Sequence, residues 1–481
     1  MTEHPNILFL MADQMQGQVL RPGHVCQTPN LDKLARRGVR FERAYTPNAV
    51  CSPARASLMT GLLPHNHGVL EVTHVVDDDQ CVLRTEHPHW AQRLEASGYQ
   101  TLYFGKWHVE RSDELGQFGW QVNGVPSGEL FRTHREEVLK GAKPHSFSVR
   151  KNNDLPEGYQ KSILYGVTDQ PVEQRGLGLT TSLAHTHLER ALQADAPWCC
   201  FVSVLEPHDP FICGEEAFAS YDVDGIELCP NVWDDLSDKP NIYRKAGRTW
   251  ADFTDRHKKE AAACYYASVT EIDKEFGRLI DLVASAGQMD NTIVVVTSDH
   301  GELLGSHGLY CKNFSGFEEV YHIPMVIAGP GIARDKVSRA RVGLHDLCPT
   351  LLDLANADAI ESADSRSFAA AARDPEKCSE AFRQGYAEYH GGRYRLTQRV
   401  VYDGNWKLVM NGFDFDELYN LDEDPFEMQN LIASPAHASQ VRALTKYMWQ
   451  VIRDTGDRSL WNSQYPVLRV APFGPEILKD A

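Results

Sequence analysis

The stretch "TPNLDKLARRGVRFERAYTPNAVCSPARASLMTG", residues 28–61, holds two helical patterns with a strand-like run between them. Thr28-Pro29 and Ser52-Pro53 are each typical of an N-cap followed by proline at the first helical position, and Gly38 and Gly61 stand where the helices end. The alternation continues on both sides, with "NILFLMA" before this stretch and "HWAQRLEASG" and "YQTLYFGKW" after it. Such alternation predicts an α/β fold built on a large mixed, mostly parallel sheet flanked by helices.

The rest of the chain completes this prediction and adds a second unit. Residues 110–250 are less periodic and contain one strand candidate, "WCCFVSVL", so we expect long loops there. A long helix is expected from about 255 to Gly287, followed by the strand "NTIVVVTSD". After a polar candidate linker near residues 356–367, a hairpin turning at Asp403-Gly404 and a helix from about 436 predict a smaller antiparallel unit. The expected domains are a catalytic α/β domain, 1–375, and a C-terminal α+β subdomain with an antiparallel sheet, 376–481.

Composition narrows the class of protein. The 481 residues are 42% hydrophobic and carry 66 acidic against 48 basic side chains, a formal net charge of −18. This balance is ordinary for a soluble enzyme and disfavours nucleic acid or an anionic membrane surface as a partner. The N-terminus shows no leader pattern and no run approaches the length of a membrane span, so we expect a cytoplasmic protein. The cysteine count of 11 is odd, and reduced thiols are expected.

Polar pairs follow three of the predicted strands. They are Asp13-Gln14, Lys106 with His108, and Asp299-His300. Because ligands bind beyond the carboxyl ends of parallel strands, we expect these side chains to meet at one edge of the sheet. Two carboxylates, an amide oxygen and an imidazole suit a divalent cation. Oxygen alone would favour calcium or magnesium, and His300 favours manganese. The alternative is that Asp299 caps a turn and His300 packs against the sheet.

Four side chains could act on an anion. Lys106 and His108 alternate along an extended segment, so both can face one side while Trp107 turns inward. His208 follows another strand in "EPHDPF", and Lys312 lies in the loop "GSHGLYCKN". Taken singly, each suits a surface lysine or a hydrogen-bonded loop histidine equally well.

Cys51 stands at the beginning of a predicted helix, with Arg55 on the same helical face one turn later. The helix N-terminus stabilises an anion and lowers the pKa of a thiol, so a thiolate nucleophile is one interpretation. A thiolate is soft, however, whereas hard cations and sulfate or phosphate esters favour oxygen.

The segment Cys51-Ser52-Pro53-Ala54-Arg55, continued by "ASLMTG", resembles the signature of the type I sulfatases. The neighbouring motifs "TPNLDKLARRGVRFERAY", "GKWH", "SDHGELLGSHG" and "LYNLDEDPFEMQNL" make the resemblance specific, and it is weakest from 110 to 250. It implies an alkaline-phosphatase-like fold and oxidation of Cys51 to formylglycine by a formylglycine-generating enzyme. The implied reaction is hydrolysis of a small sulfate ester, whether aryl, alkyl or sugar sulfate.

The resemblance also implies roles for single residues. One hydroxyl of the hydrated aldehyde at position 51 attacks sulfur, and the other expels sulfate as the aldehyde reforms. Arg55 and Lys106 would hold developing charge, His108 would take the second hydroxyl's proton, and His208 and Lys312 would stabilise or protonate the leaving oxygen. One divalent cation, calcium first with manganese or magnesium as alternatives, would be held by Asp13, Gln14, Cys51, Asp299 and His300.

Gln14 departs from the resemblance, because the family usually has a second aspartate there. Similar pairs occur in choline sulfatases and in phosphonate monoester hydrolases, so hydrolysis of phosphonate monoesters or phosphodiesters is the alternative function. "GKWH" opposes that alternative, because those hydrolases replace its lysine and histidine with uncharged residues. A non-catalytic anion-binding relative would have lost the nucleophile, the lysines or the metal carboxylate, all of which are present.

The substrate itself is left open, as is the oligomeric state. Trp107, Tyr389 and Tyr394 could enclose a quaternary ammonium group, although core packing is the other use of these rings. Substrate preference is expected to depend on residues 62–90, 110–255 and 385–415, where His390, Arg393 and Arg395 could bind an acidic group or could be surface charges.

Overall fold

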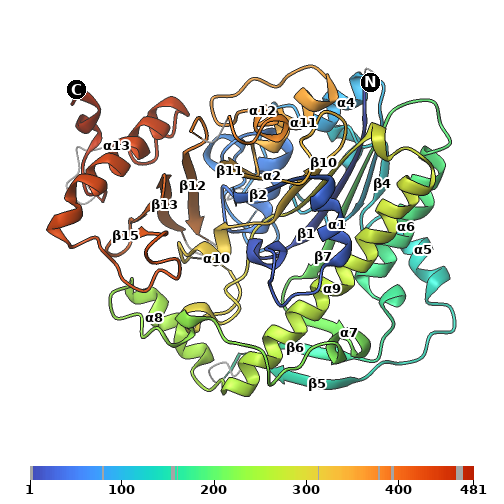
Figure 1. The fold of residues 1–481 in the computed structure, drawn as a ribbon, viewed down its shortest axis with the longest axis horizontal. Coiled ribbons are helices and arrows are strands. Elements are labelled where there is room, and N and C mark those ends of the chain that lie inside the picture. Colours follow the sequence, from blue (N-terminus) through green and yellow to red (C-terminus); the bar gives the residue numbers. More distant parts are fainter. Residues whose placement is uncertain are drawn as a thin grey trace.

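A computed structural model describes residues 4–77, 81–152, 158–159, 161–312, 314–377, 380–391, 395–461 and 470–480. Arg393 and Tyr394 lie outside these ranges. An eight-stranded sheet forms the centre of the molecule, and a four-stranded sheet formed by the C-terminal part lies to one side of it (Figure 1). The prediction of a large, mostly parallel sheet with a smaller antiparallel sheet is confirmed.

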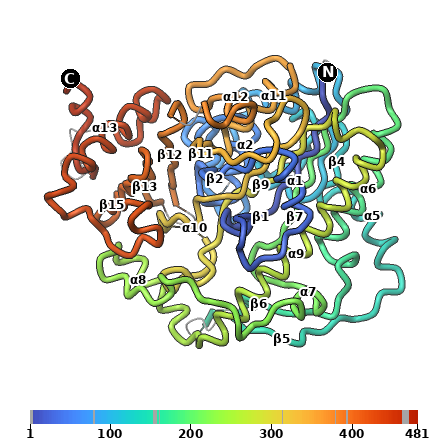
Figure 2. The backbone as a smooth tube through the Cα atoms, in the orientation of Figure 1, coloured from blue at the N-terminus to red at the C-terminus, as the bar shows by residue number. Residues whose placement is uncertain are grey.

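The central sheet has the strand order β11-β2-β10-β9-β1-β7-β3-β4. Its strands are β1 (Asn6–Asp13), β2 (Gly38–Tyr45), β3 (Gln100–Gly105), β4 (Val122–Gly124), β7 (Trp198–Pro207), β9 (Thr292–Ser298), β10 (Met325–Ala328) and β11 (Lys336–Gly343). Neighbouring strands are parallel except where β10 pairs with β2 and β9. Blue β2 and orange β11 lie side by side in Figure 2 although 290 residues of chain lie between the end of β2 and the start of β11. The antiparallel β10 makes the sheet mixed, as expected.

Helices cover both faces of this sheet because alternate side chains of β1 are apolar on both sides. Leu8 and Leu10 pack in a core with α1, α6 and α9, whereas Ile7 and Phe9 pack in a second core with α2, α4, α11 and α12. The bounds of these helices are α1 (Pro29–Arg37), α2 (Cys51–Thr60), α4 (Trp90–Ala96), α6 (Gly176–Ala191), α9 (Asp255–Ser285), α11 (Leu347–Ala355) and α12 (Ala369–Arg373). A strand buried on both faces is what parallel sheets require.

Three of the expected local signals have a definite outcome. Helix α9 confirms the predicted long helix, and Gly38 and Gly61 are the C-cap residues of α1 and α2. Ser52 is not the N-cap of α2, because the helix begins one residue earlier, at Cys51, with Val50 O accepting the first helical bond from Ala54 N at 3.1 Å. Cys51 therefore lies within the first turn.

The weak periodicity of the interval 110–250 predicted mainly loops, and this prediction is wrong. The interval contains β4 and a separate sheet of β5 (Phe147–Asn152), β6 (Ile163–Thr168) and β8 (Phe211–Gly214), together with α5 (Glu129–Val138), α6, α7 (Glu215–Ala219) and α8 (Asn241–Gly247). Helix α6 was missed because its buried face is built partly from small and polar residues. Leu177, Thr181, Ala184 and Leu188 have helical spacing but only two of them are large and apolar.

The C-terminal sheet consists of β12 (Gln384–Gly391), β13 (Arg395–Asp403), β14 (Trp406–Asn411) and β15 (Glu417–Asn420), covered by α13 (Ala438–Asp454). Asp403 pairs with Trp406, so the predicted hairpin at Asp403-Gly404 is confirmed. The polar segment before it is not a free linker, since Asp364 accepts hydrogen bonds from Leu63 N at 2.8 Å and from Asn66. The domain boundary at 375 stays a prediction.

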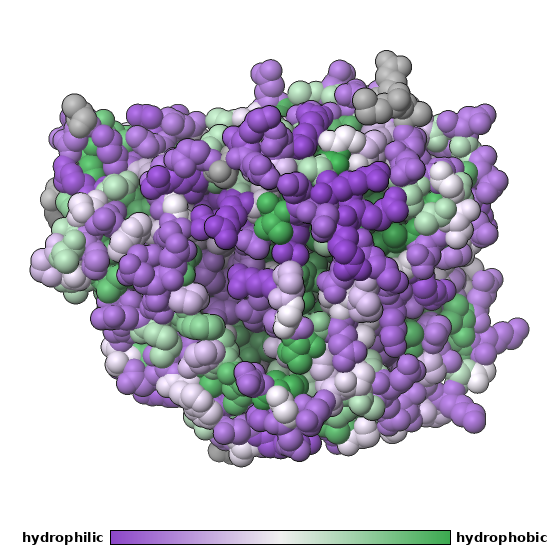
Figure 3. Space-filling model, viewed as in Figure 1, coloured by the Kyte–Doolittle hydropathy of each residue, from purple (hydrophilic) through white to green (hydrophobic). Residues whose placement is uncertain are grey.

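The visible surface of the molecule is mostly polar. On the face drawn in Figure 3 hydrophilic residues predominate, and hydrophobic ones occur in small groups. Among the described residues, every helix is too short or too polar to cross a lipid bilayer.

Candidate active site

The carboxyl ends of four parallel strands position most of the candidate residues. Asp13 is the last residue of β1, Lys106 directly follows β3, His208 directly follows β7, and Asp299 directly follows β9. Because these strands are parallel, their carboxyl ends meet at one edge of the sheet. The structure brings together all ten residues that the sequence singled out for chemistry or metal binding.

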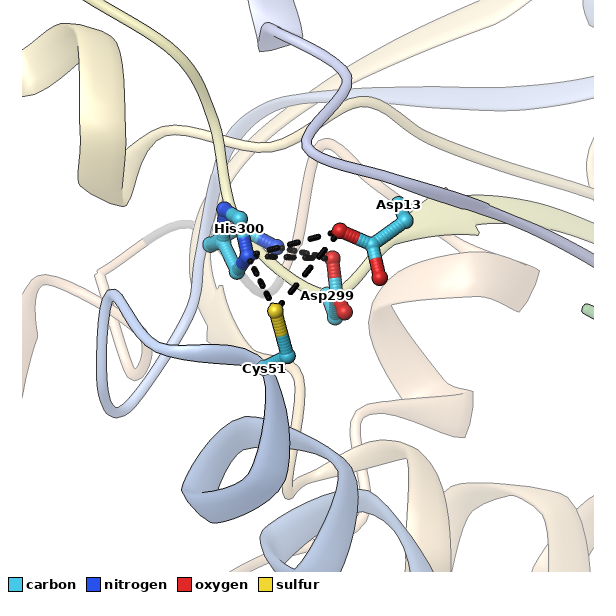
Figure 4. A group of neighbouring side chains, drawn as sticks. All are labelled: Asp13, Cys51, Asp299 and His300. Carbon is cyan, nitrogen blue, oxygen red and sulfur yellow. Dashed lines mark hydrogen bonds and ion pairs between the residues drawn. The ribbon is translucent and has the colours of Figure 1, made fainter. Parts of the chain in front are cut away.

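Cys51 lies at the centre of this cluster and points at it from the first turn of α2 (Figure 4). Its Sγ is 3.2 Å from His300 Nε2 and 3.7 Å from Asp13 Oδ1. All four side chains drawn in Figure 4 are buried. The alternative in which His300 merely packs against the sheet is therefore not what the structure shows.

The donor set fits a divalent cation. Ligand atoms of Asp13, Cys51, Asp299 and His300 lie within 4.8 Å of one another. His300 Nδ1 donates to the carbonyl oxygen of Gly301 at 2.9 Å, because that oxygen can only accept, and Nε2 faces the cluster as the ring atom that could bind a cation. Two carboxylates and a neutral imidazole are a common ligand combination for Mn²⁺ and related cations, and the carboxylates also suit Ca²⁺.

Gln14 presents its amide oxygen on the same side. Lys312 Nζ donates to Gln14 Oε1 at 2.9 Å, while Gln14 Nε2 donates to Asp209 Oδ1 at 3.0 Å and to Glu302 Oε2 at 2.5 Å. Burial and the nearby Asp209 raise the pKa of Glu302 to about 7. Asp209 and Glu302 were not predicted as site residues, although each follows a predicted one in the sequence, in "HD" and "DHGE".

Arg55 bridges the two aspartates from inside α2. Its Nε donates to Asp299 Oδ2 at 2.8 Å and its Nη2 to Asp13 Oδ2 at 3.0 Å, while Nη1 donates to Ser203 Oγ and to the carbonyl of Lys106. Burial and Cys51 raise the pKa of Asp13, but Lys106, His208 and Arg55 outweigh them and hold it well below its usual value. Asp13 is therefore an anion, as a metal ligand must be.

Lysines complete the positive surroundings of Cys51. Lys312 Nζ lies 3.0 Å from Cys51 Sγ and 2.6 Å from His208 Nε2, and Lys106 pairs with Asp13. Burial would raise the pKa of the Cys51 thiol, but Lys106, Lys312 and His300 lower it well below its usual value. Cations near position 51 stabilise negative charge there, which is the local reversal of sign that an acidic protein needs to bind an anion.

His108 meets a histidine that sequence reasoning did not single out. His108 Nε2 is 2.7 Å from His74 Nδ1, and the two rings stack at 4.8 Å. His74 is exposed and belongs to the interval 62–90, where substrate preference was expected. Burial lowers the pKa of His108, which favours a neutral imidazole able to accept a proton.

Of the three rings proposed to enclose a quaternary ammonium, the two that the structure describes, Trp107 and Tyr389, are not available for it. Trp107 and Tyr389 are each 2% exposed. Trp107 packs edge-on against Tyr103, and its Nε1 donates to Glu110 at 3.1 Å. These two rings are core residues, the alternative use that the sequence left open.

The chain matches known families and proteins along most of its length. A family model described as "Sulfatase" matches residues 5–357, and one described as "N-sulphoglucosamine sulphohydrolase, C-terminal" matches residues 305–454. A choline-sulfatase of Rhizobium meliloti is 28% identical, with 93% of this chain and 86% of the relative covered. An arylsulfatase of Clostridium perfringens is 26% identical, covering 92% and 93%.

A solved structure shares the fold. The phosphonate monoester hydrolase of Silicibacter pomeroyi aligns with a TM-score of 0.78 at 22% identity, covering 95% of this chain and 96% of the other. At this identity the likeness establishes the common architecture of sheet and helices and leaves the reaction to the site residues.

Proposed function

The chain belongs to the sulfatase family, whose members hydrolyse sulfuric esters, and from this premise we propose that it acts on a small sulfate ester with a nucleophile derived from Cys51 and a divalent cation. The observation that carries the proposal is the ring of positive groups around position 51. Arg55, Lys106 and Lys312 all contact Asp13 or Cys51, with Lys312 Nζ 3.0 Å from Cys51 Sγ.

Two groups absent from the unprocessed chain are part of the proposal. Formylglycine, made from Cys51 by a formylglycine-generating enzyme, supplies a hydrated aldehyde whose hydroxyl can attack sulfur. The cation, for which Ca²⁺ is our first choice and Mn²⁺ or Mg²⁺ the alternatives, supplies Lewis acidity to the attacking hydroxyl and the ester oxygens. Asp13, Gln14, Asp299, His300 and the side chain at position 51 would hold it.

The protein's own residues stabilise charge on the sulfuryl group. Lys106 and the N-terminus of α2 lie beside the reacting position, and Arg55 fixes the two aspartates and the carbonyl of Lys106 in place. Preorganised donors of this kind need no rearrangement during the reaction, so they stabilise the transition state more effectively than water does.

Two histidines are suited to the proton transfers. His208 and Lys312 contact each other at 2.6 Å, and the pair can deliver a proton to the leaving oxygen as the S–O bond to the alcohol breaks. His108, which interacts with position 51, accepts the proton of the second hydroxyl, so that the C–O bond to the sulfate group breaks, sulfate departs and the aldehyde is restored.

Gln14 favours one second candidate, the hydrolysis of phosphonate monoesters or phosphodiesters. An amide in place of a carboxylate makes the ligand set less negative, and the site then retains more positive charge for a phosphoryl group. Lys106 and His108 support the sulfate ester as the main substrate.

The decisive experiment compares kcat/KM for a nitrophenyl sulfate and an aryl phosphonate monoester. The protein is matured with a formylglycine-generating enzyme and supplied with Ca²⁺ or Mn²⁺. We expect the sulfate to be hydrolysed with the higher kcat/KM. A higher value for the phosphonate would instead assign the chain to the alternative function. The cytoplasmic location stays a prediction.

A further inference from the structure

The two ends of the Gln14 carboxamide meet different kinds of partner, acceptors at the nitrogen and a donor at the oxygen. Its nitrogen donates hydrogen bonds to carboxylate oxygens of Asp209 and Glu302. Its oxygen faces Lys312, which only donates. The orientation of this amide is therefore set by its partners, and turning it over would place two acceptors against oxygen and one donor against nitrogen.

We propose that Glu302 and Asp209 are positioning residues that hold the amide oxygen of Gln14 toward the cation site. This inference rests on the proposed metal site. It goes beyond the ligand set, because it assigns a function to two carboxylates outside that set and explains why an amide works at position 14.

Glu302 is built into the protein more rigidly than an ordinary surface acid. It is fully buried, and its Oε1 accepts hydrogen bonds from Leu304 N at 2.9 Å and Cys311 N at 2.6 Å. Only Oε2 remains for Gln14. The two backbone donors thus determine which oxygen of Glu302 meets the amide. Moving this carboxylate would break its hydrogen bonds with Leu304 N and Cys311 N.

This arrangement explains the departure from an aspartate at position 14. A carboxylate there would face Glu302 and Asp209, so three acidic side chains would meet in a partly buried space. Gln14 lacks the negative charge of the usual aspartate. Asp209 and Glu302 instead lie behind it and contact its amide nitrogen. Outer groups that orient a ligand typically change metal affinity by about 10–100-fold when they are removed.

The same geometry predicts what Glu302→Gln does. The backbone N–H groups of Leu304 and Cys311 still require an oxygen, so the new NH₂ group must face Gln14 Nε2. Two donors then oppose each other, and the Gln14 amide turns its nitrogen toward the cation. We expect the Kd for Ca²⁺ or Mn²⁺ to rise about tenfold or more.

The measurement is isothermal titration calorimetry of the matured, metal-stripped protein with Ca²⁺ or Mn²⁺. Glu275→Gln is the matched control, because Glu275 is buried on α9 and bonds Thr181 and Arg278 far from the ligand set. The control is expected to bind metal like the unaltered protein. If the unaltered protein binds no metal, the proposed metal site is wrong, and the inference is overturned with it. If the unaltered protein binds metal and Glu302→Gln binds it equally well, only the positioning inference is overturned.

A double-mutant cycle separates orientation from simple structural support. In Gln14→Glu, the carboxylate at position 14 has two equivalent oxygens, so either orientation presents an oxygen to the cation. In the double variant Gln14→Glu/Glu302→Gln, the NH₂ group at position 302 donates to this carboxylate. We expect Glu302→Gln to raise the Kd tenfold in the native background and to leave it unchanged or lower it in the Gln14→Glu background. An equal penalty in both backgrounds would overturn the inference, because Glu302 would then act as a direct ligand or a structural support.

Discussion

Arg55 shows how much of this site depends on the shape of one side chain. It is fully buried and donates to Asp13, Asp299, Ser203 and the carbonyl of Lys106 from three nitrogens. A guanidinium can span all four acceptors, whereas an ammonium group presents its donors at a single point.

Arg55→Lys should therefore both destabilise and inactivate the protein. It keeps the charge but leaves one of the two buried aspartates without its partner, which costs about 3–5 kcal/mol when a buried pair is broken. Urea unfolding and kcat measure the two effects. Arg278→Lys, at a half-exposed arginine of α9, is the control and should change neither by much. A fully active, stable Arg55→Lys protein would contradict the bridging role.

Substitutions at Cys51 distinguish the proposed nucleophile from an ordinary serine-like one. Cys51→Ala should abolish turnover while thermal unfolding remains cooperative, because the small buried side chain is not a large part of the core. Cys51→Ser should release at most one equivalent of alcohol and remain sulfated, since a serine has no second hydroxyl with which to expel sulfate. A product burst followed by intact-mass measurement tests both. Sustained turnover by either variant would contradict the formylglycine proposal.

Sequence reasoning found the residues of the site that follow strands and missed their partners. Asp13, Lys106 and Asp299 could be predicted because parallel strands end at one edge whatever the details of packing. Glu302 and His74 could not, because their roles come from contacts with Gln14 and His108 across 288 and 34 residues of chain. Such contacts depend on loop conformations that no local pattern encodes.

At the scale of elements, Gly105 ends β3 immediately before Lys106 and has a left-handed φ of 91°. A Cβ there would lie 1.9 Å from the carbonyl oxygen of Ser203, a backbone atom of the neighbouring strand β7. Gly98 has a similar φ of 86°, but a Cβ there would meet nothing within 4 Å. Comparing alanine substitutions at these two glycines therefore distinguishes the cost of a left-handed backbone, which both share, from the cost of steric overlap, which only Gly105 has.

Gly98→Ala should cost about 1 kcal/mol, the ordinary penalty for a left-handed alanine. Gly105→Ala carries the same strain plus overlap with β7, so we expect a further loss of about 1–3 kcal/mol and a fall in kcat as Lys106 moves. Thermal unfolding of both variants and steady-state assays provide the comparison. Equal Tm values for the two would show that β3 and β7 can separate without cost.

Elements with strong hydrophobic patterns could be predicted, and those with weak patterns could not. The apolar residues of α9 recur at helical spacing and those of β9 form a short continuous run, so the type and length of both elements could be predicted. Strand β5 is exposed along most of its length, and α7 has five residues, so neither carries a clear pattern. Their structure depends on tertiary contacts with β6, β8 and α9.

At the scale of the whole molecule, the C-terminal sheet supports the segment that precedes Cys51. Glu388 N of β12 donates to Pro47 O at 2.9 Å, and Asn48 Nδ2 donates to Glu388 O at 2.8 Å. The side chain of Glu388 accepts from His65 N and Nδ1, in the short helix α3 (Pro64–His67) that follows α2. The sequence predicted the smaller unit but not this contact.

The His65–Glu388 pair should make stability fall as the pH rises. Burial lowers the pKa of His65, but the hydrogen bond and charge of Glu388 outweigh it and raise the pKa to about 9, above the 6.5 of an unperturbed histidine. A pKa raised by folding stabilises the folded state fully below about pH 6.5, and that stabilisation is lost as the pH rises through about 9. The loss is on the order of 2 kcal/mol, since one pKa unit is worth about 1.4 kcal/mol and the pair retains some solvent contact.

Urea unfolding of the unaltered protein between pH 6 and 10, compared with His65→Gln, Glu388→Gln and the double variant, tests this link between the two sheets. Each single variant should lose the part of the pH dependence that lies between about pH 6.5 and 9, and the double variant should lose no more than either, because one interaction underlies both. If His65→Gln kept the pH dependence of the unaltered protein, the proton would belong to another group. The contact of the C-terminal sheet with the segment around Cys51 would then hold without a contribution from the His65 proton, through the hydrogen bonds of Glu388 with Pro47, Asn48 and His65 N.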